Sequence, residues 1–282
     1  MDSGWFAFAN RRYQRLMFPP RIPIVSVSPS VFQNTYSLDF DGTNDVLQTS
    51  NSFESVFKDS FTISAWIKLD DGQISTNQVI FGTQSYSNYS GYIWLRVVAS
   101  NGQLSFKHGT LTSPAAENNE FTVSASTSPF ADGASAWTHI VATLSKASAT
   151  SGTMTVYKNA SSIGTSSSPG SGWNLDNYAN TYNAYIGASN ITGTASLFLG
   201  GLIDEVSIFN TVLDSNDVTA IYNSGVPNDL TKATSYNTDR TSNLQGWWRF
   251  EEGSGTSATD SSTNSNTGTL TNGPAYSTDV PS

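Results

Sequence analysis

The sequence contains no cysteine and only two histidines, and charged residues make up just 12% of its 282 positions. The absence of cysteine excludes disulfide scaffolds, thiolate metal sites, iron–sulfur clusters and thiol catalysis. Two histidines make a His-rich metal centre improbable, so a bound metal should be a hard cation with oxygen ligands, and calcium is the first expectation. No run of 18 apolar residues is present, which predicts that the chain has no membrane span.

Basic residues are also scarce, and they are unevenly distributed. Residues 1–30 contain four arginines and one aspartate, whereas residues 31–282 contain nine basic and 21 acidic side chains. A body this acidic repels a phosphate backbone, so we expect it to have no nucleic-acid partner.

The N-terminal segment, residues 1–30, is basic, aromatic and rich in proline. Pro19, Pro20 and Pro23, together with Arg21, interrupt any apolar stretch, so the segment does not read as a signal peptide. It is either a free tail or an anchor that becomes ordered on a partner, and we favour the anchor. The expected anchoring residues are Trp5, Phe6, Phe8, Arg11, Arg12 and Arg15.

From Tyr36 onward, short runs alternate apolar and polar residues between turn-forming residues, which predicts an all-β protein. In residues 61–69 every odd-numbered position is apolar, while Trp66 falls on the other face as a packing residue or part of a binding surface. Asn101-Gly102 between two such runs predicts a type I′ hairpin turn.

One helix interrupts the strands. Asp214 can cap it, Asp217 follows three residues later as in a capping box, and Gly225 with Pro227 ends the element. We expect this helix to cover an open end of a sheet sandwich.

Five segments occur in the order found in one known family: residues 38–45, 61–67, 137–141, 154–159 and 200–210. Together they resemble the laminin-G-like jelly-roll domains of the concanavalin A-like lectin and glucanase superfamily. The resemblance implies two curved antiparallel sheets packed face to face as a sandwich. It also implies a module that usually recognises glycans or proteins and is usually not catalytic.

Two features depart from that family. Asn159-Ala160 stands where Asn-Gly is usual, which predicts a longer or bulged turn. Residues 246–270 resemble the family's opening segment but lie at the end of this chain. We favour a permuted order, in which residues 229–282 return to the same sheets, over the start of a truncated second repeat. The predicted domains are therefore an arm at 1–30 and a sandwich at 31–282.

Catalytic patterns are scarce. Asp204 and Glu205 are adjacent in a predicted strand, so we expect their side chains on opposite faces rather than paired across a cleft as in a glycosidase. Neither His108 nor His139 lies in a recognisable triad pattern. We predict that the protein is not an enzyme.

Oxygen-bearing side chains suggest a calcium site. Asp260 and Asn264 lie in a polar loop, and the resemblance places a structural calcium near the corresponding Asp-Ser-Ser loop in some relatives, with Asp204 as a further candidate ligand. Asp41 and Asp45 crowd another loop. The alternative is that these residues serve turns and caps.

Two aromatic loops suit glycan recognition, because aromatic faces stack on sugars while Asn and Asp orient hydroxyl groups. The alternative is that these rings pack the loops down or form subunit contacts. The predicted glycan-binding residues are Tyr86, Tyr89, Trp173 and Tyr178.

Proteins of marine phage particles are similar, including the terminal Gly-Trp-Trp-Arg segment at 246–249. A bacteriophage structural protein also reconciles a typically extracellular fold with the missing signal peptide. We predict a non-catalytic head decoration, fibre or tail component of a virion, anchored to other virion proteins through residues 1–30, with host surface glycans as further partners. Whether it forms a homo-oligomer stays open. The alternative is a secreted, extracellular carbohydrate-binding module.

Overall fold

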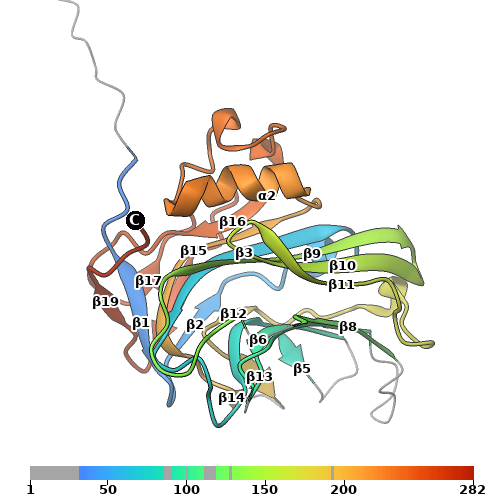
Figure 1. Ribbon diagram of the computed structural model, residues 1–282, viewed down its shortest axis with the longest axis horizontal. Coiled ribbons are helices and arrows are strands. Elements are labelled where there is room, and N and C mark those ends of the chain that lie inside the picture. The colour runs from blue at the N-terminus through green and yellow to red at the C-terminus, as the bar shows by residue number, and fades with distance from the viewer. Residues whose placement is uncertain (1–31, 86–90, 100, 111–118, 127–128, 192–193) are drawn as a thin grey trace, which may run out of the picture. The chain divides into compact units, whose positions relative to one another are not determined.

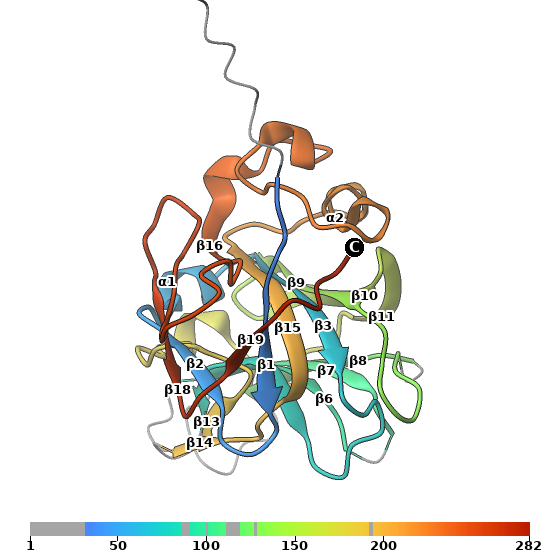
Figure 2. The same ribbon diagram turned by 90° about the vertical axis from the view of Figure 1, so that its left-hand side faces the viewer.

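The computed structural model describes residues 32–85, 91–99, 101–110, 119–126, 129–191 and 194–282. Within these ranges the chain forms a sandwich of two eight-stranded antiparallel sheets, sheet A and sheet B, with a small three-stranded sheet C beside them (Figures 1 and 2). The predicted all-β, two-sheet fold is confirmed. No helix in these ranges is long and apolar enough to cross a membrane.

The strands of each sheet come from distant parts of the chain. In spatial order, sheet A contains β11 (Ser161–Ser166), β10 (Ser151–Lys158), β9 (Thr138–Ser148), β3 (Phe61–Leu69), β15 (Gly200–Phe209), β1 (Ser37–Asp41) and β19 (Ala275–Ser277), and β16 (Leu244–Trp248) also pairs with β15. Sheet B contains β17 (Ser257–Ala258), β18 (Gly268–Thr271), β2 (Val46–Thr49), β12 (Tyr185–Ile186), β4 (Gln78–Gly82), β6 (Tyr92–Val97), β7 (Leu104–Gly109) and β8 (Glu120–Ser124). Sheet C contains β14 (Thr194–Ser196), β13 (Ser189–Ile191) and β5 (Gln84–Ser85).

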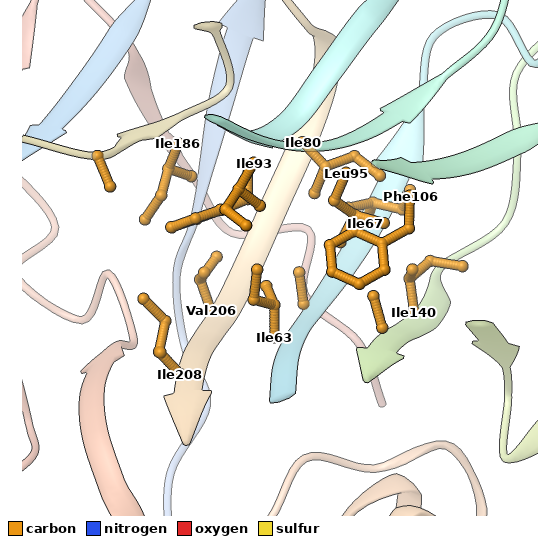
Figure 3. Packing of buried hydrophobic residues seen from close by; sticks show 14 of the residues in the cluster. Ile63, Ile67, Ile80, Ile93, Leu95, Phe106, Ile140, Ile186, Val206 and Ile208 are labelled. Atoms are coloured by element: carbon orange, nitrogen blue, oxygen red, sulfur yellow. The ribbon is translucent and has the colours of Figure 1, made fainter. Parts of the chain in front are cut away.

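The core lies between sheets A and B, as the period-two alternation predicts. Figure 3 shows Ile63 and Ile67 of β3 pointing toward Ile93 and Leu95 of β6, and all four side chains are fully buried. Burying one such side chain stabilises the fold by roughly 1.5–3 kcal/mol.

The C-terminal segment contributes to both sheets. Strands β16 and β19 join sheet A beside β15 and β1, whereas β17 and β18 extend sheet B beside β2. Residues 229–282 thus complete the sandwich that residues 37–209 begin.

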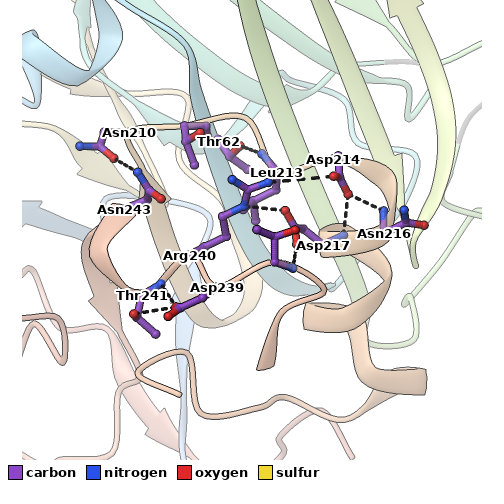
Figure 4. A network of polar contacts seen from close by, with 12 residues as sticks. Thr62, Asn210, Leu213, Asp214, Asn216, Asp217, Asp239, Arg240, Thr241 and Asn243 are labelled. Atoms are coloured by element: carbon purple, nitrogen blue, oxygen red, sulfur yellow. Dashed lines mark hydrogen bonds and ion pairs between the residues drawn. The ribbon is translucent and has the colours of Figure 1, made fainter. Parts of the chain in front are cut away.

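Helix α2 (Ser215–Tyr222) covers the outer face of sheet A rather than an open end of the sandwich, which corrects our expectation (Figure 1). Asp214 caps the helix as predicted, accepting hydrogen bonds from the backbone N–H groups of Asn216 and Asp217. The carboxylate of Asp217, fully buried, accepts hydrogen bonds from the backbone of Thr238 and from Nε of Arg240 at 2.7 Å (Figure 4). These contacts tie the helix to the segment that follows it.

The remaining helices are short. Those that lie wholly within the described residues are α1 (Glu54–Phe57) and 3₁₀ turns at Leu175–Asn177, Asn223–Gly225, Ala233–Ser235 and Thr241–Asn243.

Two predicted turns differ from expectation. Asn159-Ala160 forms a two-residue connection between β10 and β11 with both φ angles positive. The irregularity in pairing lies before this turn, between Val156 and Tyr157 of β10. The turn is therefore not longer, although a bulge is present nearby. The connection between β6 and β7 runs from Val98 to Gln103, so Asn101-Gly102 is not a two-residue type I′ turn, although Gly102 does have a positive φ.

Candidate functional site

Strand β15 contains a bulge that changes where its acids point. Ile203 and Val206 both lie in the core, so Asp204 and Glu205 between them share the outer face of sheet A. Glu205 takes a left-handed φ of 51° at this point. Our expectation that the two carboxylates face opposite sides is therefore wrong.

Both carboxylates of this pair are enclosed. Glu205, 4% exposed, accepts hydrogen bonds from Nε1 of Trp247 at 2.6 Å and Nε of Arg249 at 3.1 Å. Burial raises the pKa of Glu205 to about 8 against the lowering effect of these donors. Burial and the charge of Glu205 raise the pKa of Asp204 as well. The oxygens of the pair serve structure and are not open to a substrate.

Residues 32–36, which we call the strap, cover this acid pair. The ring of Phe32 stacks on Trp247 with centroids 6.2 Å apart, and the side-chain amide of Asn34 donates to Asp204 at 2.9 Å. The backbone N–H of Thr35 donates to Glu251 at 2.9 Å. The predicted anchoring residues Trp5, Phe6, Phe8, Arg11, Arg12 and Arg15 precede the strap and lie outside the described residues.

Ser64 and His139 lie side by side in the structure. A serine beside a histidine can act as nucleophile and base, and the sequence did not suggest this pair. Ser64 Oγ and His139 Nε2 are 2.8 Å apart, and the cavity beside them measures about 10 Å³, room for roughly one water molecule. Trp66 and Tyr222 stack over the imidazole. Trp66 is thus a packing residue, and this enclosed pair has no space for a substrate.

Two predicted glycan-binding residues lie in the core. Trp173 is 1% exposed and donates its indole N–H to Nδ1 of His108, and Tyr178 is fully buried against Phe57. The prediction that Trp173 and Tyr178 contact a glycan is therefore wrong, because their loop folds inward to fill the space beside sheet B. Tyr86 and Tyr89 lie outside the described residues.

The predicted calcium ligands are engaged by the protein. Asp260 accepts four hydrogen bonds, from the backbone of Trp247, Ser262 and Asn266 and from the Ser262 hydroxyl. These match the four lone-pair sites of a carboxylate. Asn264 donates to the Leu244 carbonyl, whereas Asp204 bonds to the strap. Among the described residues no three His, Cys, Asp or Glu side chains are grouped to hold a metal, and calcium binding stays a prediction.

A surface groove of about 260 Å³ lies where β9 begins and β10 ends. Trp137 forms one wall, and its indole N–H donates to Asp279 at 2.8 Å, which fixes the ring. The side-chain oxygen of Asn159 accepts a hydrogen bond from the backbone N–H of His139, so the NH₂ group of Asn159 can donate to a ligand. The other lining residues are Pro129, Phe130, Ala131, Ala134, Ser135, Ala136, Thr138 and Lys158.

The chemistry of this groove suits a polar ligand with an apolar face. A half-buried tryptophan ring offers a stacking surface between small alanine side chains, and Lys158 and Asn159 supply donors at one end. Lys158 already donates to the Pro129 carbonyl, so its ammonium group is held in place. We call this the Trp137 groove.

A second feature lies on the outer face of sheet B. Tyr92, Trp94 and Arg96 alternate along β6, with the Tyr92 and Trp94 ring centroids 4.7 Å apart and the Arg96 guanidinium 5.2 Å from the Trp94 ring. Lys107 and Glu120, on the two next strands, form an ion pair at 2.7 Å. We call these five residues the sheet B face.

Sequence reasoning missed both features for different reasons. Alternation along β6 could have placed Tyr92, Trp94 and Arg96 on one face. The Trp137 groove combines a loop with a hairpin tip about twenty residues away, and no local pattern reports that they meet.

Comparison with known families agrees with this architecture. Residues 41–219 match the family model described as the concanavalin A-like lectin/glucanases superfamily, and the chain belongs to that family. No curated protein sequence matches it.

Two solved structures share the fold. A candidate carbohydrate-binding protein from Bacteroides ovatus is 18% identical with a TM-score of 0.57 and aligns with 89% of this chain, which spans 62% of its length. The CBM40 module of the Ruminococcus gnavus IT-sialidase is 12% identical with a TM-score of 0.51, covering 66% of this chain and 97% of the module. At these identities the likeness shows the fold, which is that of lectin-like and carbohydrate-binding proteins.

Proposed function

We propose that the protein binds carbohydrate without cleaving it, through the Trp137 groove. The groove's volume, its fixed tryptophan ring and the donors of Lys158 and Asn159 carry this proposal. The enclosed states of Glu205 and of the Ser64–His139 pair support a non-catalytic role. Membership of a lectin-like family and likeness to carbohydrate-binding modules support it further.

The test is binding of the full chain to a panel of immobilised neutral oligosaccharides, followed by calorimetry on those retained. Trp137→Ala should weaken binding about tenfold, because it removes the stacking surface. Tyr182→Ala is the control, since Tyr182 is an exposed aromatic residue that does not line the groove. Equal loss in both variants, or no retained oligosaccharide, would reject the proposal.

A finer proposal concerns where the protein acts. We propose that it is a bacteriophage virion component, a head decoration, fibre or tail protein, anchored to other virion proteins through residues 1–30 and displaying the sandwich to host glycans. The basic, aromatic composition of residues 1–30 and the absence of cysteine support this role. The alternative is a secreted carbohydrate-binding module.

Deletion of residues 1–30 separates these two roles. On the virion proposal, the full chain co-sediments with purified particles in mass spectrometry, and the deletion abolishes incorporation while leaving glycan binding intact. Absence of the full chain from particles, with a trimmed form in the medium, would favour the secreted module.

A further inference from the structure

Arg96 differs from the other arginines that the structure describes. Arg240 is paired with Asp217 at 2.7 Å, and Arg249 with Glu205 at 3.1 Å. Arg96 makes neither an ion pair nor a hydrogen bond with any described residue, and its Nε is buried without an acceptor. Nε is therefore an unsatisfied buried donor, whereas the terminal nitrogens of this half-buried guanidinium are not enclosed and can donate to a ligand.

The guanidinium of Arg96 lies over an aromatic ring, with its central carbon 5.2 Å from the Trp94 ring centroid. Trp94 lies against it and is itself held by a hydrogen bond from its indole N–H to Ser189 Oγ at 2.7 Å. Tyr92 packs on Trp94, and its hydroxyl donates to Glu120. The two terminal nitrogens of a guanidinium can donate side by side to the two oxygens of a carboxylate.

The local charge also favours an anion. Charged side chains in the eight strands of sheet B are Arg96, Lys107 and Glu120, so this sheet carries one excess positive charge in an otherwise acidic chain. Glu120 forms hydrogen bonds with Lys107 and Tyr92 and acts on Arg96 only through its charge, so Arg96 is the cation of this sheet that forms no ion pair with a described residue. Nearby positive charge of this kind attracts a negatively charged ligand.

We propose that the sheet B face binds an acidic sugar, with the Arg96 guanidinium donating two hydrogen bonds to the sugar carboxylate and the half-buried Trp94 ring bordering the sugar ring. Tyr92, which is 2% exposed, supports the Trp94 ring and does not reach the ligand. This proposal rests on the chain being a carbohydrate-binding protein, but not on the Trp137 groove. Both sialic acids and uronic acids carry the required carboxylate, so the experiment tests each.

The experiment compares matched pairs of soluble sugars by calorimetry on the full chain. The pairs are α2,3-sialyllactose with lactose, and methyl glucuronide with methyl glucoside. The wild type should bind the carboxylated member of at least one pair at least about tenfold more tightly, as expected for hydrogen bonds to a charged group. The preferred pair then identifies the source of the carboxylate.

Two substitutions locate the effect. Arg96→Gln should abolish the preference for the acidic sugar. Arg96→Lys should retain part of it, because lysine keeps the positive charge but cannot donate two parallel hydrogen bonds to a carboxylate. Lys232→Gln is the control for net charge, because this side chain is 64% exposed and belongs to neither sheet. Circular dichroism checks that each variant is folded.

The outcomes separate this proposal from the previous one. Equal binding of both members of each pair by the wild type, or an acidic preference retained in Arg96→Gln, overturns the role of Arg96. Neutral-sugar binding that depends on Trp137 can persist in that case, and the proposed function then stands. An equal loss of acidic preference in Lys232→Gln would also overturn the site, because it would indicate a net-charge effect.

Discussion

Trp247 donates its indole N–H to the carboxylate of Glu205, with 2.6 Å between the heavy atoms, although 42 residues separate the two in sequence. The contact joins β16 to the bulge of β15 at the point where the partner of β15 changes from β1 to β16. It shows how the C-terminal segment is fastened to the middle of sheet A.

Glu205 should make stability depend on pH in an unusual direction. Its pKa is raised from 4.5 to about 8 in the fold, so between these values the folded state holds a proton that the unfolded state has released. Stability should then fall as pH rises, by at most about 1.4 kcal/mol per pH unit, and level off above pH 8. Glu205→Gln removes this pH dependence. The free energy of unfolding in urea should therefore increase for the variant relative to the wild type as pH rises through this range. A variant-to-wild-type difference that is constant with pH would contradict the prediction.

Asp217 and Asp214 should differ in their contribution to stability. Asp214→Ala removes a helix cap and should cost about 1 kcal/mol. Asp217→Ala removes a fully buried carboxylate and leaves Arg240 and the Thr238 N–H without their acceptor, so about 3 kcal/mol is expected. Chemical unfolding of the two variants side by side measures the difference. Equal losses of stability in the two variants would show that the buried contacts of Asp217 stabilise the fold no more than the helix cap at Asp214 does.

Substitution of Trp173 should reduce stability, whereas substitution of Trp137 should reduce oligosaccharide binding. Trp173→Ala creates a cavity in the core and removes the hydrogen bond to His108, so a loss of about 3–5 kcal/mol is expected. Trp137→Ala acts at the surface and should cost about 1 kcal/mol or less. Thermal unfolding measured alongside oligosaccharide binding tests both. A large loss of stability in Trp137→Ala would remove that variant as a probe of the groove.

Calcium binding has a direct thermal test. If Asp260 and Asn264 bind the ion, excess calcium should raise Tm relative to a chelator, because a ligand that binds the folded state stabilises it. Asp260→Asn should then abolish the rise. An identical Tm in calcium and chelator would instead leave Asp260 as the acceptor that organises the loop between Asp260 and Asn266.

Much of the fold follows from local patterns in the sequence. Alternation along β3 predicts which side chains enter the core, and the cap at Asp214 predicts the start of α2. These predictions hold because burial and capping are decided within a few residues.

The site depends on contacts that local patterns do not report. Alternation alone places Asp204 and Glu205 on opposite faces. The bulge that puts both on one face has its left-handed φ at Glu205 rather than at a glycine, so the sequence gives no signal of it. Trp173 lies in a polar loop yet packs on Phe121, which only the folded chain reveals. The missing partner of Arg96 is likewise a property of the three-dimensional arrangement.

The strap also determines how a mechanical load enters the sandwich. Any tension carried by residues 1–31 reaches the described fold at Phe32, where the ring stacks on Trp247 and on the Arg249 guanidinium, 4.2 Å away. Asn34 and Thr35 then pass the load to Asp204 and Glu251 before it reaches β1. The force is therefore divided between β15, β16 and the residues that follow β16 before it reaches β1, and no single contact carries it alone.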